Sequence, residues 1–326
     1  APDVASHLDA KHTRVFVPEM TMSRYVNRQY EALGQADSIT VDPHKAGYIP
    51  YPAGGLCYRN GATRDIVSFT APVVFHGGVD PTVGVYGIEG SKPGAAAAAT
   101  FLSHRVIRPD QSGYGKILGQ CMFNSKRLYA AVVTMAREDD NFIVVPFQGL
   151  PVERAGGGPE EIAEQLWFIG ERIVPPSNEE LLKDKEAMEL MRELGSDQII
   201  ISYTFNLKTE EGVNTDPDRL IDLNKRLFRK LSLNPGQDDV THTPMIVTSS
   251  DFDPAVYGSG LVGDYMRRLG LKGPAEKPSP FLISTTMDPW VTETAEGNFI
   301  PVLIDALRDI VTETVNEFLD QGEKHG

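Results

Sequence analysis

The sequence predicts a layered protein of the α/β or α+β class. Short runs of β-branched or apolar residues alternate with longer stretches in which apolar residues follow the helical period. The composition of the 326 residues, with 41% hydrophobic and 23% charged residues, is typical of a globular chain that buries a core. Strands and helices that alternate along a chain in this way usually pack in layers.

In the first 195 residues the pattern predicts three short strands, at residues 38–41, 56–59 and 142–147. Helices are predicted where apolar residues recur with helical spacing, at residues 24–36, 95–106, 113–137, 160–174 and 178–194. The segment between the first two strands is rich in proline and glycine, which end regular strand pairing, so we expect a turn there.

The spacing of strands and helices changes near residue 196, and we place a domain boundary there, between residues 1–195 and 196–326. The second part contains predicted strands at residues 199–206, 245–250 and 281–286. Its predicted helices cover residues 216–231, 261–269 and 298–319. The first of these begins at Asp216 and Pro217, a favourable pair for a helix start.

Charge and cysteine content exclude several classes of partner. The chain has 31 Lys and Arg against 45 Asp and Glu, a net charge of −14, which disfavours nucleic acids and anionic membranes. It has no run of about 18 apolar residues that could span a bilayer. Cys57 and Cys121 cannot form a disulfide framework, and no zinc-type cluster is present. We therefore expect a protein of a reducing compartment, the cytoplasm, without a bound metal.

The segment with the most informative chemistry runs from Ser38 to Gly55. In it, Lys45 follows a predicted strand and stands beside His44 in a turn of proline and glycine. A lysine held against backbone amides is partly desolvated, which lowers the pKa of its amine, and a neutral amine can form a Schiff base with an aldehyde. The alternative is an ordinary solvated lysine in a surface loop.

The segment Asp42–Lys45, with the sequence Asp-Pro-His-Lys, and the Gly-Tyr-Ile-Pro-Tyr of residues 47–51 resemble the lysine motif of the group II pyridoxal-phosphate (PLP) decarboxylases. The bacterial tyrosine decarboxylase type is the most similar. Residues 89–94, 112–116 and 287–290 resemble further segments of that family in the same order. The resemblance implies the fold-type I PLP-dependent transferase fold. This chain would provide the C-terminal part of its large domain and its small C-terminal α/β domain.

The resemblance also implies which residues contact the cofactor. Lys45 would hold PLP as a Schiff base, and His44 and Asp42 would lie against the cofactor phosphate. Relatives often have Asn in place of Asp42, and a carboxylate is unfavourable beside a phosphate, so Asp42 would act through its backbone or a bridging water. Gly90 and Ser91 match a turn that reaches the phosphate of the neighbouring subunit in the family dimer.

For the substrate and the proton donor, the resemblance implies four further residues. Tyr51 matches a tyrosine of the substrate pocket, and Ser284 and Thr285 lie on a strand that approaches the substrate. His76 falls in the region of the family's catalytic loop, where the usual loop tyrosine has no counterpart, so His76 is the candidate proton donor. The alternatives are core packing for Tyr51, a structural role for His44 and a solvated loop position for His76.

Two features that the family requires upstream of its lysine do not occur before Lys45. They are an aspartate that keeps the pyridine nitrogen of PLP protonated and a histidine that stacks on the ring. We therefore expect this chain, which begins at Ala1 without a signal-peptide pattern, to be the C-terminal half of a decarboxylase. An N-terminal half, as a separate or cleaved chain, would complete it, and the complete unit would form a homodimer.

The function that the resemblance implies is PLP-dependent decarboxylation of an L-amino acid to an amine and carbon dioxide. Tyrosine or another aromatic amino acid is favoured, because no arginine near Tyr51 would pair with an acidic side chain. Three alternatives remain open. The first is an aldehyde-synthase variant, which the missing loop tyrosine suggests. The second is a glutamate or aspartate decarboxylase, since acidic substrates are the nearest alternative within the family. A non-catalytic regulatory paralogue is the third, although the retained Lys45 argues against it.

Overall fold

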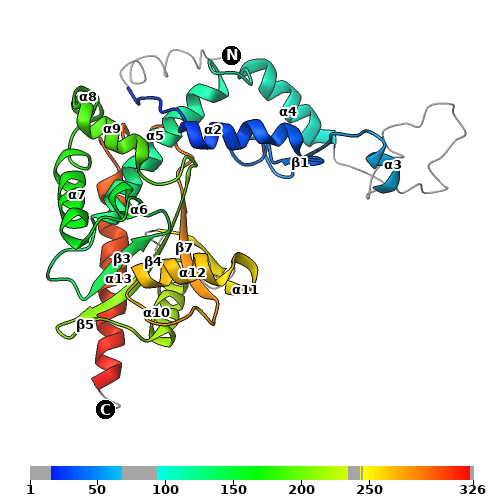
Figure 1. Cartoon of the computed structure of the whole chain (residues 1–326). Coiled ribbons are helices and arrows are strands. Elements are labelled where there is room, and N and C mark those ends of the chain that lie inside the picture. The colour runs from blue at the N-terminus through cyan, green and yellow to red at the C-terminus, as the bar shows by residue number, and fades with distance from the viewer. Residues whose placement is uncertain (1–15, 68–93, 234–242, 244, 324–326) are drawn as a thin grey trace, which may run out of the picture. The chain divides into compact units, whose positions relative to one another are not determined.

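The computed structural model describes residues 16–67, 94–233, 243 and 245–323 (Figure 1). The chain divides into two compact units. We call residues 22–118 the lysine unit, because it contains Lys45, and residues 1–21 with 119–326 the sheet unit. The predicted domain boundary after residue 195 lies within the sheet unit and stays a prediction.

The lysine unit contains a two-stranded antiparallel sheet. Strand β1 (Ser38–Val41) pairs with β2 (Gly55–Tyr58), with Val41 opposite Gly55 at the end that carries the connecting turn. The helices that begin in this unit are α2 (Arg24–Glu31), the short 3-10 helix η2 (Ala32–Gln35), α3 (Thr63–Val67), α4 (Gly94–Val106) and α5 (Tyr114–Val133). The Ser23 hydroxyl caps α2 by accepting a hydrogen bond from the Val26 N–H.

The sheet unit is built on strands in the order β3-β4-β7-β6, and β5 pairs with β4 off this path. Their bounds are β3 (Phe142–Pro146), β4 (Ile200–Thr209), β5 (Gly212–Val213), β6 (Thr248–Phe252) and β7 (Ser279–Thr285). Every strand pair in the described part of the chain is antiparallel. The predicted mixture of helices and strands is confirmed, in the α+β form of the two that the sequence left open.

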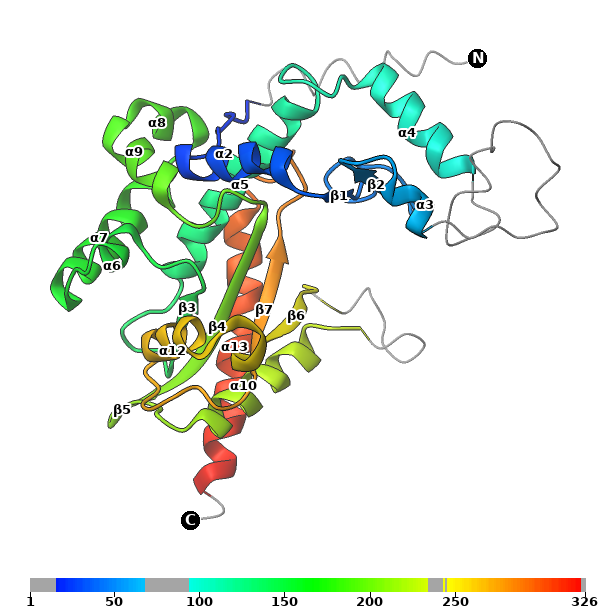
Figure 2. The same ribbon diagram turned by 45° about the vertical axis from the view of Figure 1, so that its right-hand side comes forward.

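Helices cover both faces of this sheet (Figures 1 and 2). On one face, the Arg308 guanidinium of α13 (Ile300–Glu323) lies 5.9 Å from the centre of the Phe142 ring. On the other face, the Tyr265 hydroxyl of α12 (Ser259–Arg268) donates a hydrogen bond to the Val145 carbonyl. Val145 and Phe142 are three positions apart on β3, so their side chains point to opposite faces.

The buried Asn224 of α10 (Pro217–Lys230) completes the edge of β4 where β7 no longer pairs with it. The register of β4 with β7 ends at Tyr203. Beyond it, the Phe205 N–H donates to the Asn224 side-chain oxygen at 3.0 Å, and the Asn224 amide donates to the Phe205 carbonyl at 2.7 Å. A buried strand edge needs such partners, because unpaired backbone groups are costly away from water.

The predicted helix over residues 178–194 is wrong, because the structure has two helices there, α8 (Asn178–Lys183) and α9 (Lys185–Glu193). Asp184 separates them: its carboxylate accepts a hydrogen bond from the Ala187 N–H and caps α9. Arg172, at the end of α7 (Pro159–Arg172), binds the same carboxylate at 2.7 and 2.9 Å.

The other long predicted elements are confirmed, with ends that differ by a few residues. The largest difference is at the helix predicted over 24–36, where the α-helix ends at Glu31 and a 3-10 helix follows; the helix predicted over 113–137 ends at Val133, and the one over 298–319 extends to Glu323. The sequence analysis missed β5, α3, α6 (Pro151–Arg154) and α11 (Pro254–Tyr257), which are too short to show a periodic pattern. None of the described helices is both long enough and apolar enough to cross a membrane.

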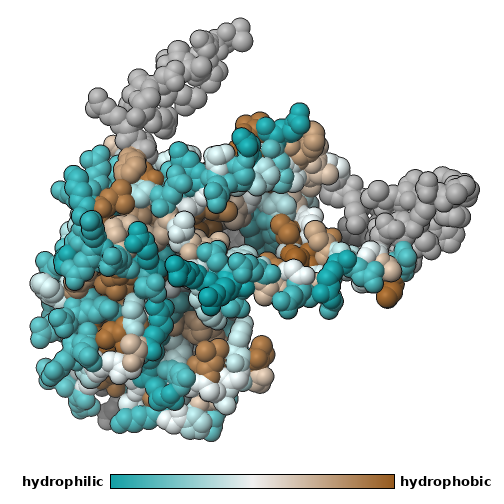
Figure 3. Space-filling model, turned by 45° about the horizontal axis from the view of Figure 1, so that its top comes forward, coloured by the Kyte–Doolittle hydropathy of each residue, from teal (hydrophilic) through white to brown (hydrophobic). Residues whose placement is uncertain are grey.

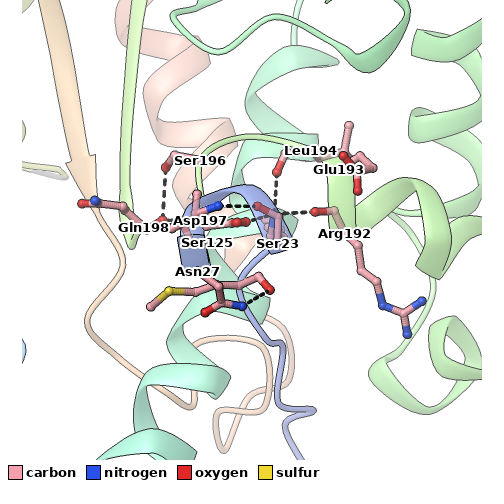
Figure 4. A network of polar contacts seen from close by, with 12 residues as sticks. Ser23, Asn27, Ser125, Arg192, Glu193, Leu194, Ser196, Asp197 and Gln198 are labelled. Atoms are coloured by element: carbon pink, nitrogen blue, oxygen red, sulfur yellow. Dashed lines mark hydrogen bonds and ion pairs between the residues drawn. The ribbon is translucent and has the colours of Figure 1, made fainter. Parts of the chain in front are cut away.

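Inside the sheet unit, a buried lysine of α5 holds the turn that follows α9 (Figure 4). The Lys126 side chain is 1% exposed, and its ammonium donates to the carbonyls of Arg192 and Leu194 at 2.9 and 2.8 Å. It also donates to the Asp197 carboxylate at 3.0 Å. Burial lowers the pKa of Lys126, and Asp197 opposes this shift by favouring the charged form.

We predict that Asp197→Ala lowers the free energy of unfolding of the sheet unit by about 3–5 kcal/mol, because it leaves a buried ammonium without its counter-charge. Trp167 and Trp290 are the two tryptophans of the chain, and both lie in the sheet unit, so their fluorescence during urea unfolding reports on it. The control is Asp264→Ala, which breaks an exposed pair with Arg267 and should change stability by less than about 1 kcal/mol. Equal effects of the two variants would contradict the prediction.

Candidate functional site

The segment Asp42–Ala53, which we call the lysine turn, connects β1 to β2 and folds back on itself through backbone hydrogen bonds. The Lys45 N–H donates to the Asp42 carbonyl and the Ile49 N–H donates to the Pro43 carbonyl, both at 3.0 Å. The Tyr48 N–H donates to the Lys45 carbonyl at 2.9 Å. These bonds fix the backbone on both sides of Lys45.

Close packing at Gly47 explains the glycine of the motif. A Cβ atom at this position would lie 2.6 Å from the Pro43 carbonyl oxygen, closer than real Cβ contacts allow. The next residue, Tyr48, has a φ of 56°, in the left-handed region that residues other than glycine rarely adopt. The turn therefore depends on these particular backbone conformations.

Lys45 is exposed and protonated in this structure. Its ammonium lies 2.7 Å from the Asp42 carboxylate, and the two side chains are 63% and 33% exposed. The hydrogen bond with Asp42 raises the pKa of Lys45, and the same bond lowers the pKa of Asp42. The expectation of a desolvated lysine with a lowered pKa is therefore wrong for the chain by itself. Asp42, which was expected to act through its backbone or a bridging water, contacts Lys45 through its carboxylate.

His44 is held by the returning end of the lysine turn. Its Nδ1 atom contacts the Ala53 carbonyl, the Ala53 N–H donates to Nδ1 at 3.4 Å, and the His44 N–H donates to the Ala53 carbonyl at 3.4 Å. The Tyr51 ring lies against His44, with 4.0 Å between ring centres and 38° between planes. Tyr51 is 72% exposed, so it is not a core residue of the lysine unit.

Beside the lysine turn lies an open hollow of about 560 Å³. One wall is formed by the turn and the other by the end of α4 and the start of α5. Its lining residues are Val41, Asp42, Pro43, Ala46, Gly47, His104, Pro109, Asp110, Gln111, Tyr114, Gly115 and Leu118. The hollow is large enough for a small-molecule ligand.

Tyr114 connects the two walls. Its hydroxyl donates to the Gly47 carbonyl at 2.9 Å and lies 2.6 Å from the Ser103 hydroxyl, and its ring meets the His104 ring edge to face. The sequence analysis noted the segment 112–116 but gave Tyr114 no role. The glycine that precedes it, Gly113, was the available signal in the sequence. The structure shows why a glycine is needed there: a Cβ atom would lie 2.1 Å from the Arg108 carbonyl oxygen.

The remaining predicted site residues belong to the other unit or fall outside the described residues. Ser284 and Thr285 lie at the end of β7 in the sheet unit, where the Ser284 hydroxyl is 2.9 Å from the Tyr203 hydroxyl and Thr285 is exposed. Burial raises the pKa of Tyr203 to about 12, so this phenol stays protonated. His76, Gly90 and Ser91 lie outside the described residues. The structure thus brings together Asp42, His44, Lys45 and Tyr51.

Part of this chain is similar to known decarboxylases. It is 41% identical over 115 residues to an L-tyrosine decarboxylase of Enterococcus faecium and 43% identical over 110 residues to one of Enterococcus faecalis. These matches cover 35% and 33% of this chain. A probable L-tyrosine/L-aspartate decarboxylase of Methanocella arvoryzae is 27% identical over 176 residues, 53% of this chain.

The chain spans only part of each relative: 19% and 18% of the two bacterial proteins and 43% of the archaeal one. No family model matches the chain. These relatives are amino-acid decarboxylases, which are carboxy-lyases.

We predict that Asp42→Asn makes Lys45 more reactive toward an amine-directed reagent at about pH 9. The substitution removes the carboxylate that raises the pKa of Lys45, so a larger fraction of the amine is neutral and nucleophilic at that pH. Peptide mapping of the labelled chain measures the rate at each lysine. Lys277, whose pKa is raised by Asp218, is the internal control and should keep its rate. An unchanged rate at Lys45 would show that Asp42 does not hold its proton.

Proposed function

From the homology of this chain, over about a third of its length, to group II PLP-dependent decarboxylases, we propose that it is part of a PLP-dependent L-amino-acid decarboxylase. The family of its homologues uses PLP. The observation that carries the proposal is the lysine turn, which presents the exposed amine of Lys45 together with His44 and Tyr51 and forms one wall of the hollow. We also propose the fold-type I architecture, which the homology supports.

The residues of the lysine turn fit such a cofactor. PLP has an aldehyde, and Lys45 offers an exposed primary amine that can bond to it. The aromatic pair of His44 and Tyr51 offers flat surfaces on the same turn, and Asp42, Pro43, Ala46 and Gly47 of this turn line the hollow. The Asp42 carboxylate would repel a phosphate once Lys45 leaves it, so Asp42 would act on the cofactor phosphate through its backbone or a bridging water.

When bound, PLP would accept the electron pair that carbon dioxide leaves behind on the substrate. The role of this chain would be to position and to control protons. Lys45 would carry the cofactor through Nζ, which first has to lose its proton and its contact with Asp42. Tyr114, through the Gly47 carbonyl, would keep the lysine turn in place, and it is a positioning residue.

Residues in other parts of the chain complete the proposal. Gly90 and Ser91 would provide backbone amides for the cofactor phosphate of the neighbouring subunit in the dimer. His76 would donate the proton that replaces the lost carboxylate. Ser284 and Thr285 would contact the substrate, with the Tyr203 hydroxyl holding Ser284.

We propose that a further polypeptide segment, the N-terminal half, covers part of the lysine unit. Helices α2 and α4 have no buried residue, and α4 exposes Phe101 by 63%, Leu102 by 62% and Val106 by 84%. Apolar residues at the surface are visible as brown atoms in Figure 3. Exposed apolar surface of this kind is usual at interfaces. The bacterial relatives are several times longer than the matched segments, which supports a partner of this origin. The complete unit would form a homodimer.

For the substrate we propose L-tyrosine or another aromatic amino acid. The names of the bacterial relatives support tyrosine, and the exposed Tyr51 offers a ring and a hydroxyl beside Lys45. The name of the archaeal relative includes aspartate, so aspartate is the competing substrate.

We predict that borohydride reduction of the assembly purified from its source attaches a pyridoxyl group to Lys45. Reduction makes the bond between the lysine and the cofactor permanent, and peptide mapping by mass spectrometry locates it. Lys45→Arg should remove the label, whereas Lys116→Arg, in the same unit, should keep it. A label on another lysine, or none with the companion segment present, would contradict the assignment of Lys45.

We predict that the assembly releases carbon dioxide from L-tyrosine faster than from L-aspartate. Tyr51→Phe should lower kcat/KM for L-tyrosine about three- to tenfold, the effect of one lost hydrogen bond. Tyr257→Phe, at a half-exposed tyrosine of α11 in the sheet unit, should leave it unchanged. Faster turnover of aspartate would overturn the aromatic assignment. Formation of peroxide and ammonia would instead support the aldehyde-synthase variant.

A further inference from the structure

The sheet unit contains a pocket of about 210 Å³ to which the proposed decarboxylase function assigns nothing. It lies between the start of α10, the end of α12 and the loop that leads into β7. Most of its lining is apolar, from Pro217, Leu220, Ile221, Met266, Leu271, Pro274 and Ala275. An apolar cavity of about 150 Å³ holds one benzene ring, so this pocket can hold a ring with a substituent.

A buried hydroxyl without a partner lines this pocket. Ser279 is 3% exposed, and its Oγ atom makes no hydrogen bond to any residue within the described ranges. Ser279 is two positions before Phe281 on β7, so its side chain points to the same sheet face. Phe281, Leu220 and Met266 form the apolar cluster on that face. The hydroxyl therefore lies on the sheet face that the pocket covers, where a polar group of a ligand would give it the partner that it lacks.

Charged side chains of both signs stand at the rim. Lys272, Glu276 and Lys277 line the pocket and are exposed. Lys277 is already paired with the Asp218 carboxylate, at 2.8 and 3.0 Å. Lys272 and Glu276 thus provide one positive and one negative charge for a ligand at the mouth of the pocket.

We propose that this pocket binds a free aromatic α-amino acid with a hydroxyl on its ring, of the size of tyrosine. The ring occupies the apolar part, and the ring hydroxyl bonds to Ser279. The α-carboxylate faces Lys272 and the α-ammonium faces Glu276, because a zwitterion matches two opposite charges at the rim. This inference goes beyond the proposed decarboxylation and does not depend on it.

The test is calorimetric titration of the full chain carrying Lys45→Ala, so that the lysine turn cannot bond to added compounds. We expect L-tyrosine to bind with a Kd below about 1 mM. Ala275→Phe, which fills the pocket, should weaken binding at least about tenfold. Ser279→Ala should weaken L-tyrosine about fivefold and leave L-phenylalanine, which lacks the hydroxyl, unchanged. Ser232→Ala, outside the pocket, is the matched control.

The charged rim is tested with ligands that lack one charge. Lys272→Gln should weaken L-tyrosine and leave tyramine, which has no carboxylate, unchanged. Glu276→Gln should weaken L-tyrosine and leave 4-hydroxyphenylacetate, which has no ammonium, unchanged.

Absence of L-tyrosine binding, or equal effects of Ser279→Ala on both amino acids, would overturn the proposal. So would wild-type affinity in folded Ala275→Phe; if that variant does not fold, the Ser279→Ala comparison decides alone. None of these results depends on whether Lys45 holds PLP, so failure of either proposal is recognised separately.

Discussion

The buried ammonium of Lys126 is the interaction on which the loops around α5 depend. It binds two carbonyls and the Asp197 carboxylate in the turn before β4. Neighbouring residues of the same helix act in a similar way: Asn124 donates to the Asp288 carbonyl, and Arg127 donates to the carbonyls of the segment before α8. Burial lowers the pKa of Arg127 to about 10, and three hydrogen bonds, to the Asn178 side chain and the carbonyls of Val174 and Pro176, offset the loss of water around the guanidinium. α5 thus fixes, by polar contacts, segments that carry little regular structure of their own.

The same helix begins at the candidate site. Its first residue, Tyr114, donates to the Gly47 carbonyl, 67 positions earlier in the sequence, and supports the turn that presents Lys45. The turn itself holds Lys45 in its charged form, because Asp42 raises the pKa of the amine. A lysine that has to bond to an aldehyde must first become neutral. In the proposed function, Asp42 therefore controls when Lys45 can react, and the cofactor would compete with Asp42 for the amine.

The two units differ in how many of their apolar residues are buried. The sheet unit has a cluster of buried aromatic rings, with Phe252 stacked at 4.0 Å on Phe281, and helices on both sheet faces. In the lysine unit, α2 and α4 bury no residue. A unit with so little core of its own gains stability from further contacts, which agrees with the proposal of a companion segment. The pocket at Ser279 belongs to the well-packed unit, where a hydroxyl without a partner is unusual.

The sequence by itself determined what depends on local chemistry. The period of the apolar residues placed the long helices and strands. The motif around Lys45 predicted the turn, because glycine and proline act on the adjacent backbone, and it indicated the resemblance to decarboxylases. The tertiary structure decided what depends on residues far apart in the sequence. The Asp184 carboxylate, which caps α9, also binds Arg172 of another helix. Lys45 is exposed because nothing in the described lysine unit buries it, and the Tyr114 contact with the turn joins two distant segments. Contacts of this kind are set by packing, and no local pattern encodes them.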